Sequence, residues 1–357
     1  MKRREFMVMG AAAGAAKAMG ANTGEPAKLA LGYDNYAVRG MKWKAPALID
    51  YAAKMKVDSL FISDLDAFES LDDAHLIELR KRAEGKGVKL TLGTWSVCPT
   101  SPSFKDKWGT ADEHLQLGIR ATKALGSPVL RVILGSAKDR KTDGGIEARI
   151  ADMVAVLKRN KERAVDAGMK IAVENHAGDM HSMELKSLVE AAGPDYVGVN
   201  LDSGNAVWCL ETPQQNLENL GKYVLTTSLR DSAVWKSEHG VTVQWTAMGE
   251  GMVDWKSYFK RFAELCPNAA VNIETISGFN REFPLNSDSF KSAQPEGAPG
   301  SMAEFSQWAA TGTPRKPWQA PKGGDRKKAE QGYQLDELER SLTYCRSLGL
   351  GRRKYTS

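Results

Sequence analysis

The chain has 357 residues, of which 42% are hydrophobic and 26% charged, and this composition excludes wholesale disorder. Its 49 Lys and Arg exceed its 44 Asp and Glu by 5, but the surplus lies at the two ends of the chain. The central part therefore lacks the overall positive bias of a nucleic-acid-binding protein. The four cysteines are widely separated, which excludes zinc-finger spacing, and no disulfide is assigned.

Residues 1–21 resemble a bacterial twin-arginine export signal. Arg3-Arg4 is followed by Phe6, a weakly apolar Ala/Gly-rich run and small residues at a cleavage position, whereas Lys17 departs from the pattern. We expect a protein that is exported already folded to the periplasm; the alternative is an amphipathic N-terminal segment. No other stretch approaches the roughly 18 consecutive apolar residues of a spanning helix, so no stable membrane span is expected.

Short apolar runs alternate with longer helical patterns through residues 26–357, which we interpret as one domain. The period of the apolar residues switches each time between that of a strand and that of a helix. Eight such alternations favour an α/β fold, a closed (β/α)8 TIM barrel, over the alternative of an open doubly wound sheet. The expected strands are residues 29–33, 59–62, 89–93, 129–134, 170–174, 196–201, 223–228 and 270–274. The expected helices lie near residues 47–56, 75–80, 115–121, 147–167, 183–192, 214–220, 254–265 and 334–348.

Residues 278–332 interrupt this rhythm. The segment is rich in Ser, Pro, Gly and Lys, has little apolar periodicity and is too long for an ordinary barrel loop. We interpret it as an irregular insertion between strand eight and the last helix. Because it follows strand eight directly, it either lies over or near the barrel mouth or forms a surface excursion.

Polar residues follow four consecutive predicted strands at the point where each strand ends. Glu174, Asp202 and Glu274 lie at three of these ends, and the carboxyl ends of barrel strands converge on one mouth. Three carboxylates there repel one another, and a divalent cation is the simplest relief. The alternative is a buried ion network in which they pair with Arg131, Arg230 or Lys170.

In these residues the chain resembles the xylose-isomerase-like TIM barrel superfamily of sugar isomerases and epimerases. Asn205 after the strand-six Asp and the glycine-rich run 248–251 add to the resemblance. It implies one divalent metal ion, of unknown identity among Mn, Mg, Zn and Co, bound by Glu174, Asp202 and Glu274. It also implies that the two glutamates are the catalytic acid/base pair.

The predicted seventh strand departs from the family pattern, because Ser228 stands where a histidine ligand is usual and Arg230 replaces a lysine. Serine is a poor neutral metal ligand. Three alternatives follow: water or substrate oxygen completes a three-carboxylate site, His176 or His239 supplies the missing ligand, or metal binding is lost.

A metal ion bound to a sugar carbonyl and its neighbouring hydroxyl stabilises an enediolate, so that a base can remove the intervening C–H proton. We therefore expect a metal-dependent isomerase or epimerase acting on a small-molecule carbohydrate. No glycine-rich phosphate cradle is visible, which favours an unphosphorylated substrate. Indole rings stack on sugar faces, and Trp245 lies in the same expected loop as Trp235. The candidate substrate-binding residues are Trp95, His176, Asn205, Trp208, Arg230 and Trp235.

Two other functions are compatible with the same residues. One is a lyase that cleaves oxidised (3-keto) glycosides by β-elimination after the same proton abstraction. The other is a non-catalytic carbohydrate-binding barrel, which Ser228 makes plausible. Apurinic-site endonucleases share the barrel, but the resemblance to them implies a histidine-rich three-zinc centre, and this chain has 5 histidines. Nucleic acid is therefore not an expected partner, and homo-oligomerisation is left open.

Overall fold

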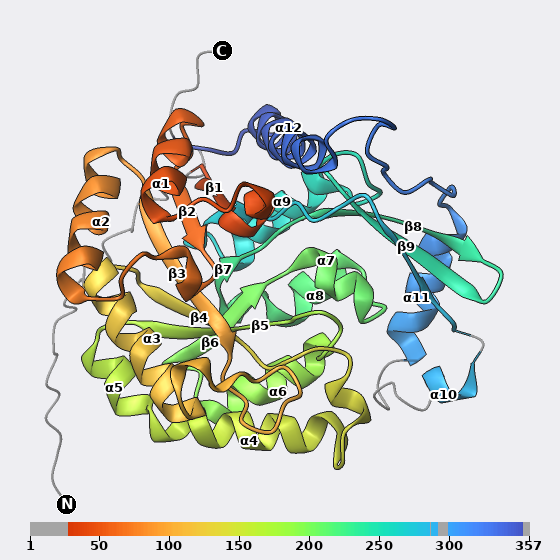
Figure 1. The fold of residues 1–357 in the computed structure, drawn as a ribbon. Coiled ribbons are helices and arrows are strands. Elements are labelled where there is room, and N and C mark those ends of the chain that lie inside the picture. The colour runs from red at the N-terminus through yellow and green to blue at the C-terminus, as the bar shows by residue number, and fades with distance from the viewer. Residues whose placement is uncertain (1–27, 286, 292–298, 353–357) are drawn as a thin grey trace, which may run out of the picture.

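The computed structural model describes residues 28–285, 287–291 and 299–352 (Figure 1). The expected export signal lies outside the described residues. Eight parallel strands form one sheet surrounded by helices, as predicted for a TIM barrel. These strands are β1 (Leu31–Asp34), β2 (Ser59–Ile62), β3 (Lys89–Ser96), β4 (Val129–Ile133), β5 (Lys170–Glu174), β6 (Val197–Leu201), β7 (Val224–Thr227) and β10 (Val271–Ile273).

The barrel closes between β7 and β10. Hydrogen-bonded neighbours run in the order β10-β1-β2-β3-β4-β5-β6-β7, and a parallel bridge joins Leu229 to Ile273 across the remaining gap. The Leu229 N–H donates to the Asn272 carbonyl at 2.8 Å, and the Glu274 N–H donates to the Leu229 carbonyl at 2.9 Å. The carboxyl ends of all eight strands therefore surround one mouth.

Helices cover the outside of the barrel, and the sequence specifies where several of them begin and end. Thr110 forms a capping box with Glu113 at the start of α3, and Gly126 ends this helix at a φ of 72°, a conformation that favours glycine. The helices are α1 (Ala45–Lys54), α2 (Asp73–Gly85), α3 (Ala111–Leu125), α4 (Gly145–Arg159), α5 (Lys161–Asp166), α6 (Ser182–Ala192), α7 (Ser203–Trp208), α8 (Pro213–Leu220), α9 (Trp255–Leu265), α10 (Asp288–Lys291), α11 (Pro299–Ala310) and α12 (Arg326–Ser347).

The main hydrophobic core lies between the strands and these helices, and all four cysteines are buried as free thiols. The barrel interior, in contrast, includes hydrogen-bonded polar side chains. The Ser59 hydroxyl donates to the Asn272 side chain at 2.8 Å, and the Asn272 amide donates to Thr226 at 3.2 Å. The strands thus carry polar groups inward as well as at their ends.

A three-stranded antiparallel sheet projects from the barrel beside α11 (Figure 1). It consists of β8 (Asp231–Ser237), β9 (Gly240–Thr246) and β11 (Asn280–Phe283). The sequence analysis placed Trp235 and Trp245 in a loop after the seventh strand and interpreted 278–332 as irregular. It therefore did not predict this sheet or the helices α10 and α11. A second hydrophobic core joins the two segments through Val234, Val243, Phe283 and Phe305, and it also includes Val207 and Leu210.

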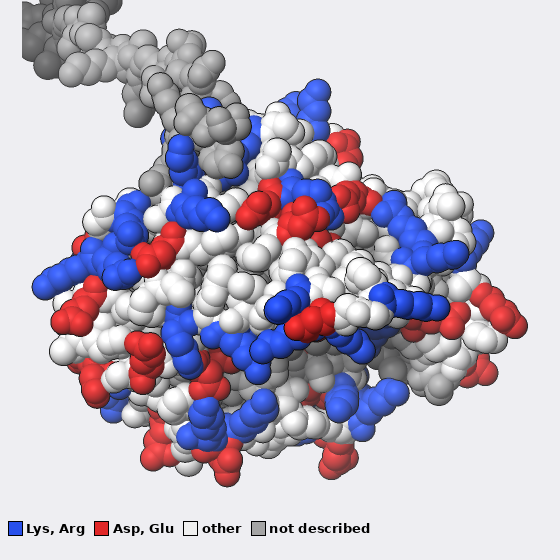
Figure 2. Space-filling view, turned by 45° about the horizontal axis from the view of Figure 1, so that its top comes forward, with Lys and Arg blue, Asp and Glu red and all other residues white. Residues whose placement is uncertain are grey.

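Basic and acidic side chains are interspersed on the face shown in Figure 2, without a large area of one sign. Such a mixed surface does not produce the extended positive field that attracts a polyanion. Of the helices in the described residues, none combines the length and the apolar character needed to cross a membrane.

The buried His114 of α3 predicts a loss of stability in mild acid. Its ring accepts or donates a hydrogen bond at 2.7 Å to Thr94, and burial lowers its pKa from 6.5 to about 4. The unfolded chain therefore binds the proton first as the pH falls, and stability is lost from about pH 6.5 downward. We expect His114→Gln to reduce the pH slope of the unfolding free energy between pH 6.5 and 4 by up to about one proton. Chemical denaturation at several pH values measures this slope, and an unchanged slope would contradict the assignment.

Candidate active site

The three carboxylates predicted from the sequence lie together at the barrel mouth. Glu174 is the last residue of β5, Asp202 follows β6 directly and caps α7, and Glu274 follows β10. All three are at most 5% exposed. Strand geometry alone brings these residues to one end of the barrel, as the order of polar residues in the sequence indicated.

A single guanidinium nitrogen joins two of these carboxylates. Nη2 of Arg230 donates to Asp202 Oδ2 and to Glu274 Oε2, and Arg230 itself is 1% exposed. Asp202 and Glu274 therefore both contact one atom, and this atom is Nη2 of Arg230 rather than a metal ion. Ion pairs of this burial need good geometry to offset desolvation, and loss of one partner leaves an uncompensated charge.

The third carboxylate, Glu174, has its own cation. Arg131 Nε lies 2.7 Å from Glu174 Oε2, and the Asn200 amide donates to the same oxygen at 2.8 Å. Asn205 links the two halves of the cluster, because its amide donates to Asp202 Oδ2 at 2.7 Å and to Glu174 Oε1 at 3.3 Å. In this structure Asn205 contacts the acidic residues, although the sequence analysis placed it in substrate binding.

The structure adds a fourth acidic residue, Asp34, at the end of β1. It accepts a hydrogen bond from Ser63 at 2.7 Å and one from Ser228 at 3.3 Å. Burial, followed by repulsion from Glu274, raises the pKa of Asp34 to about 8. The Leu31-Gly-Tyr-Asp34 strand end carries the same signal as the other strand ends, but the sequence analysis did not use it.

Burial also raises the pKa values of Asp202 and Glu274, while the neighbouring Arg230 lowers both. The opposing influences arise because four carboxyl groups share the mouth with two guanidinium groups. Burial therefore favours the protonated forms of Asp202 and Glu274, whereas Arg230 favours their ionised forms.

His176, which follows β5 at the mouth, has a neutral ring. Its Nδ1 is 2.6 Å from the Gly135 carbonyl, which accepts only, so Nδ1 carries the proton and Nε2 is an acceptor. Burial lowers the pKa of His176 to about 4. Asp179, which the sequence analysis missed, fixes this loop by accepting the His176 N–H at 2.9 Å and the Gly135 N–H at 3.1 Å.

Aromatic rings border the carboxylate cluster on two sides. Trp95 lies edge-on to His176, with ring centroids 5.4 Å apart. On the other side Trp208 stacks on Trp245 at 4.0 Å, and Phe279 meets both rings edge-on. Trp245 is covered by Trp208 and by the Arg230 guanidinium, and Arg281 lies over Trp208. Of these rings, Trp95 and the exposed Phe279 therefore offer the apolar surface that a sugar could contact.

Three other residues named in the sequence analysis lie outside the carboxylate cluster. Trp235 is buried in β8 opposite Thr242 of β9. His239 is exposed at the turn between β8 and β9. The hairpin carries the histidine away from the barrel strands, so the prediction that it reaches the metal position is corrected. Lys170 begins β5, at the opposite end of the strand from Glu174.

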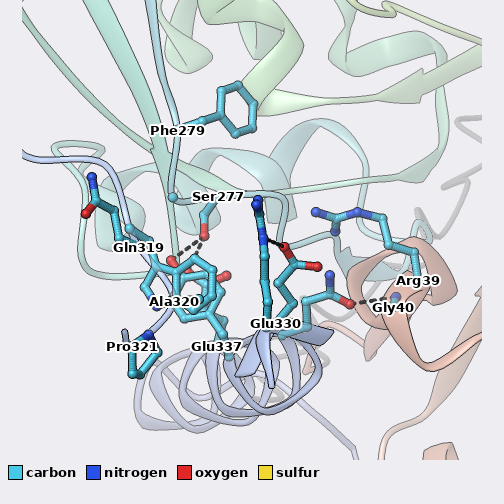
Figure 3. A pocket seen from close by; sticks show the side chains of 14 residues that line it. Arg39, Gly40, Ser277, Phe279, Gln319, Ala320, Pro321, Glu330 and Glu337 are labelled. Atoms are coloured by element: carbon cyan, nitrogen blue, oxygen red, sulfur yellow. Dashed lines mark hydrogen bonds and ion pairs between the residues drawn. The ribbon is translucent and has the colours of Figure 1, made fainter. Parts of the chain in front are cut away.

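A pocket of about 780 Å³ opens beside the carboxylate cluster, and Figure 3 shows its lining. Helix α12 supplies one wall, and Arg39, Ser277, Phe279 and residues 318–321 supply the others. Arg39 donates to the carbonyl of Thr275, the residue after Glu274, at 3.5 Å. The acidic residues of the cluster do not line this pocket, so it is an adjacent space at the mouth rather than the cluster itself.

The donor set does not fit the divalent metal ion that the resemblance implied. Asp202 Oδ2 and Glu274 Oε2 are bonded to the Arg230 guanidinium. Ser228, in the place of the usual histidine, interacts with Asp34 and Asn200. Within the described part of the chain, no group of three His, Cys, Asp or Glu side chains has an arrangement that holds a metal ion. Of the three alternatives left by the sequence, loss of metal binding agrees best with this geometry.

The glycine-rich turn 248–251 is held by Asp231, the residue after Arg230. Asp231 accepts N–H groups of Ser232 at 2.7 Å, Gly249 at 3.0 Å and Gly251 at 3.0 Å. A Cβ atom on Gly251 would collide with the Asp231 carboxylate. The turn thus anchors the strand end that carries Arg230.

Comparison with known proteins places the chain in a family. The model of the xylose isomerase-like TIM barrel family matches residues 49–289, and the chain belongs to this family. A curated relative, 3-oxo-isoapionate decarboxylase from Pectobacterium atrosepticum, is 25% identical over 211 residues, which cover 58% of this chain and 69% of the relative.

Solved structures with the same fold include D-psicose 3-epimerase from Clostridium cellulolyticum H10. It has a TM-score of 0.56 and 15% identity, and the match covers 90% of this chain and 100% of that chain. The IOLI protein with a bound zinc atom has a TM-score of 0.56 and 14% identity, covering 80% of this chain and 100% of that chain. These likenesses concern the fold alone.

The contacts of Asp231 predict that its removal destabilises the protein. Asp231→Ala removes the acceptor of the buried Ser232 N–H and of the partly buried N–H groups of Gly249 and Gly251, and we expect a loss of about 1–3 kcal/mol in the unfolding free energy. Asp231→Asn keeps one acceptor oxygen and should lose less. Denaturant unfolding of both variants checks this order, and an alanine variant as stable as the parent would contradict it.

Proposed function

We propose that the chain is a carbohydrate-acting enzyme that forms an enediolate at the barrel mouth, as a sugar isomerase or epimerase of an unphosphorylated substrate. The observation that carries the proposal is the meeting of Glu174 and Glu274 from different strands around buried guanidinium groups. Membership of the family supports the reaction class, and Trp95 beside His176 together with the exposed Phe279 of the adjacent pocket supports a sugar.

In the proposed reaction, a carboxylate removes the proton from the carbon next to the substrate carbonyl. The electron pair of the broken C–H bond moves to the carbonyl oxygen, where guanidinium N–H groups stabilise the negative charge. The other glutamate, in its acid form, returns a proton to carbon. The neutral His176 supplies an acceptor nitrogen for a substrate hydroxyl. No step passes through a metal ion, because the donor set does not fit one.

A second candidate is a decarboxylating lyase, favoured by the similarity to 3-oxo-isoapionate decarboxylase. In that case the bond between the substrate carbon and its carboxylate breaks, CO2 leaves, and the electron pair moves to the same carbonyl oxygen. A proton then goes to carbon. The β-elimination of 3-keto glycosides also begins with an anion stabilised at this oxygen. All three outcomes use the same oxyanion site.

We also propose that the protein acts in the periplasm after twin-arginine export, on the basis of Arg3, Arg4 and Phe6. Fractionation of bacteria expressing the full chain tests this. We expect the chain in the periplasmic fraction, shortened by cleavage of the signal. Full-length protein confined to the cytosol would contradict the proposed export.

The acid/base assignment predicts a large loss of activity in Glu174→Gln and Glu274→Gln. General acid and base groups contribute about 10²- to 10⁴-fold to rate, and each variant is expected to lose turnover in that range. Unphosphorylated ketoses, 3-keto glycosides and a 3-oxo sugar acid are incubated in D2O, and C–H exchange and products are followed by NMR. Glu218→Gln serves as the matched control, because Glu218 pairs with Arg261 on the outer surface.

The products separate the candidates. C–H exchange with inversion of the exchanging carbon supports an epimerase, and exchange with a shifted carbonyl supports an isomerase. Loss of the aglycone supports elimination. Release of CO2 from a 3-oxo sugar acid supports the decarboxylase. Sugar binding without any of these reactions, equal in the parent and both glutamine variants, would leave the non-catalytic binding barrel instead.

A further inference from the structure

Arg230 is held in place by features that do not depend on the acidic residues. Its N–H donates to the Ser203 hydroxyl at 2.9 Å, and the same hydroxyl donates to the Arg230 carbonyl at 2.7 Å. Its side chain passes directly over Gly204, where a Cβ atom would lie 2.5 Å from Arg230 Cδ. The Trp245 ring lies 4.3 Å from the guanidinium carbon. The surroundings are thus shaped for this side chain.

The guanidinium also has unused donors. Nη2 bonds to both Asp202 and Glu274, but the buried Nε has no hydrogen-bond partner among the residues that the structure describes. The described contacts include no hydrogen bond from Nη1. A guanidinium carries five N–H donors, so the group retains donors after neutralising the two carboxylates.

We propose that Arg230 takes the place of a divalent cation in this chain, so that its site binds no divalent ion and its guanidinium stabilises the substrate oxyanion. The inference rests on the proposed function for its chemical role, but metal binding is measured independently of turnover. Ser228 agrees with it, because this position offers no imidazole nitrogen and its hydroxyl lies 3.3 Å from Asp34.

The difference in cation has a chemical consequence. A metal ion acts as a Lewis acid and lowers the pKa of bound oxygen ligands, whereas a guanidinium acts through charge and directed hydrogen bonds. Turnover is therefore expected to survive chelation. The pair of carboxylates that would otherwise be metal ligands is already satisfied in the resting protein.

The test is titration of the full chain with Mn²⁺ and with Zn²⁺ after treatment with a chelator. Calorimetry, elemental analysis and the thermal midpoint are read together. We expect no stoichiometric ion and no shift of the midpoint in the parent protein. In Arg230→Met with Ser228→His, the carboxylates lose their guanidinium and gain an imidazole, and we expect one equivalent of metal and a higher midpoint on its addition.

Arg230→Lys with Ser228→His is the matched control, since it keeps a cation beside the same imidazole and is expected to bind no metal. One equivalent bound by the parent protein would overturn the inference, whether or not the variants fold. Turnover that appears only after metal addition would overturn it while the proposed function stands. A parent chain that binds no metal and converts no carbohydrate supports the replacement of the divalent cation by Arg230, but contradicts the proposed function and the oxyanion role that rests on it.

Discussion

The central constraint is the burial of four carboxyl groups at one end of a closed barrel. Asp34, Glu174, Asp202 and Glu274 are all at most 5% exposed, and acidic groups so placed repel one another and lose hydration. Two buried arginines from the same barrel supply the compensating charge. The protein tolerates this cluster because its carboxylate oxygens contact guanidinium, amide, hydroxyl or backbone N–H groups.

The rest of the mouth orients these charges. Asn200 and Asn205 connect the acidic residues across β5 and β6, and Asp231 with its glycine-rich turn anchors the strand end beyond Arg230. The antiparallel sheet brings Trp245 against the guanidinium. An element outside the barrel therefore contributes directly to the site, which preorganises its donors before a ligand binds.

The sequence predicted the barrel well, because each strand is a short apolar run and each helix has its own period and stop signal. It also predicted that Glu174, Asp202 and Glu274 lie at the same end of the barrel, because the carboxyl ends of parallel strands all lie at one end. It did not predict the antiparallel sheet, whose core joins β8 and β9 to a segment about 40 residues later. The sequence allowed two interpretations of the acidic residues, a bound metal ion or ion pairs with buried side chains such as Arg230. Only the positions of the side chains distinguish between them. Asp34 was not predicted, because it ends the first strand of the barrel and the family pattern involves only strands five to eight.

The most direct test of the account is a crystal structure of the full chain grown with Mn²⁺, with anomalous scattering data collected. The account predicts continuous density for the Arg230 guanidinium between the Asp202 and Glu274 carboxylates and no anomalous peak beside them. A manganese peak between these carboxylates, with the arginine turned away, would contradict it.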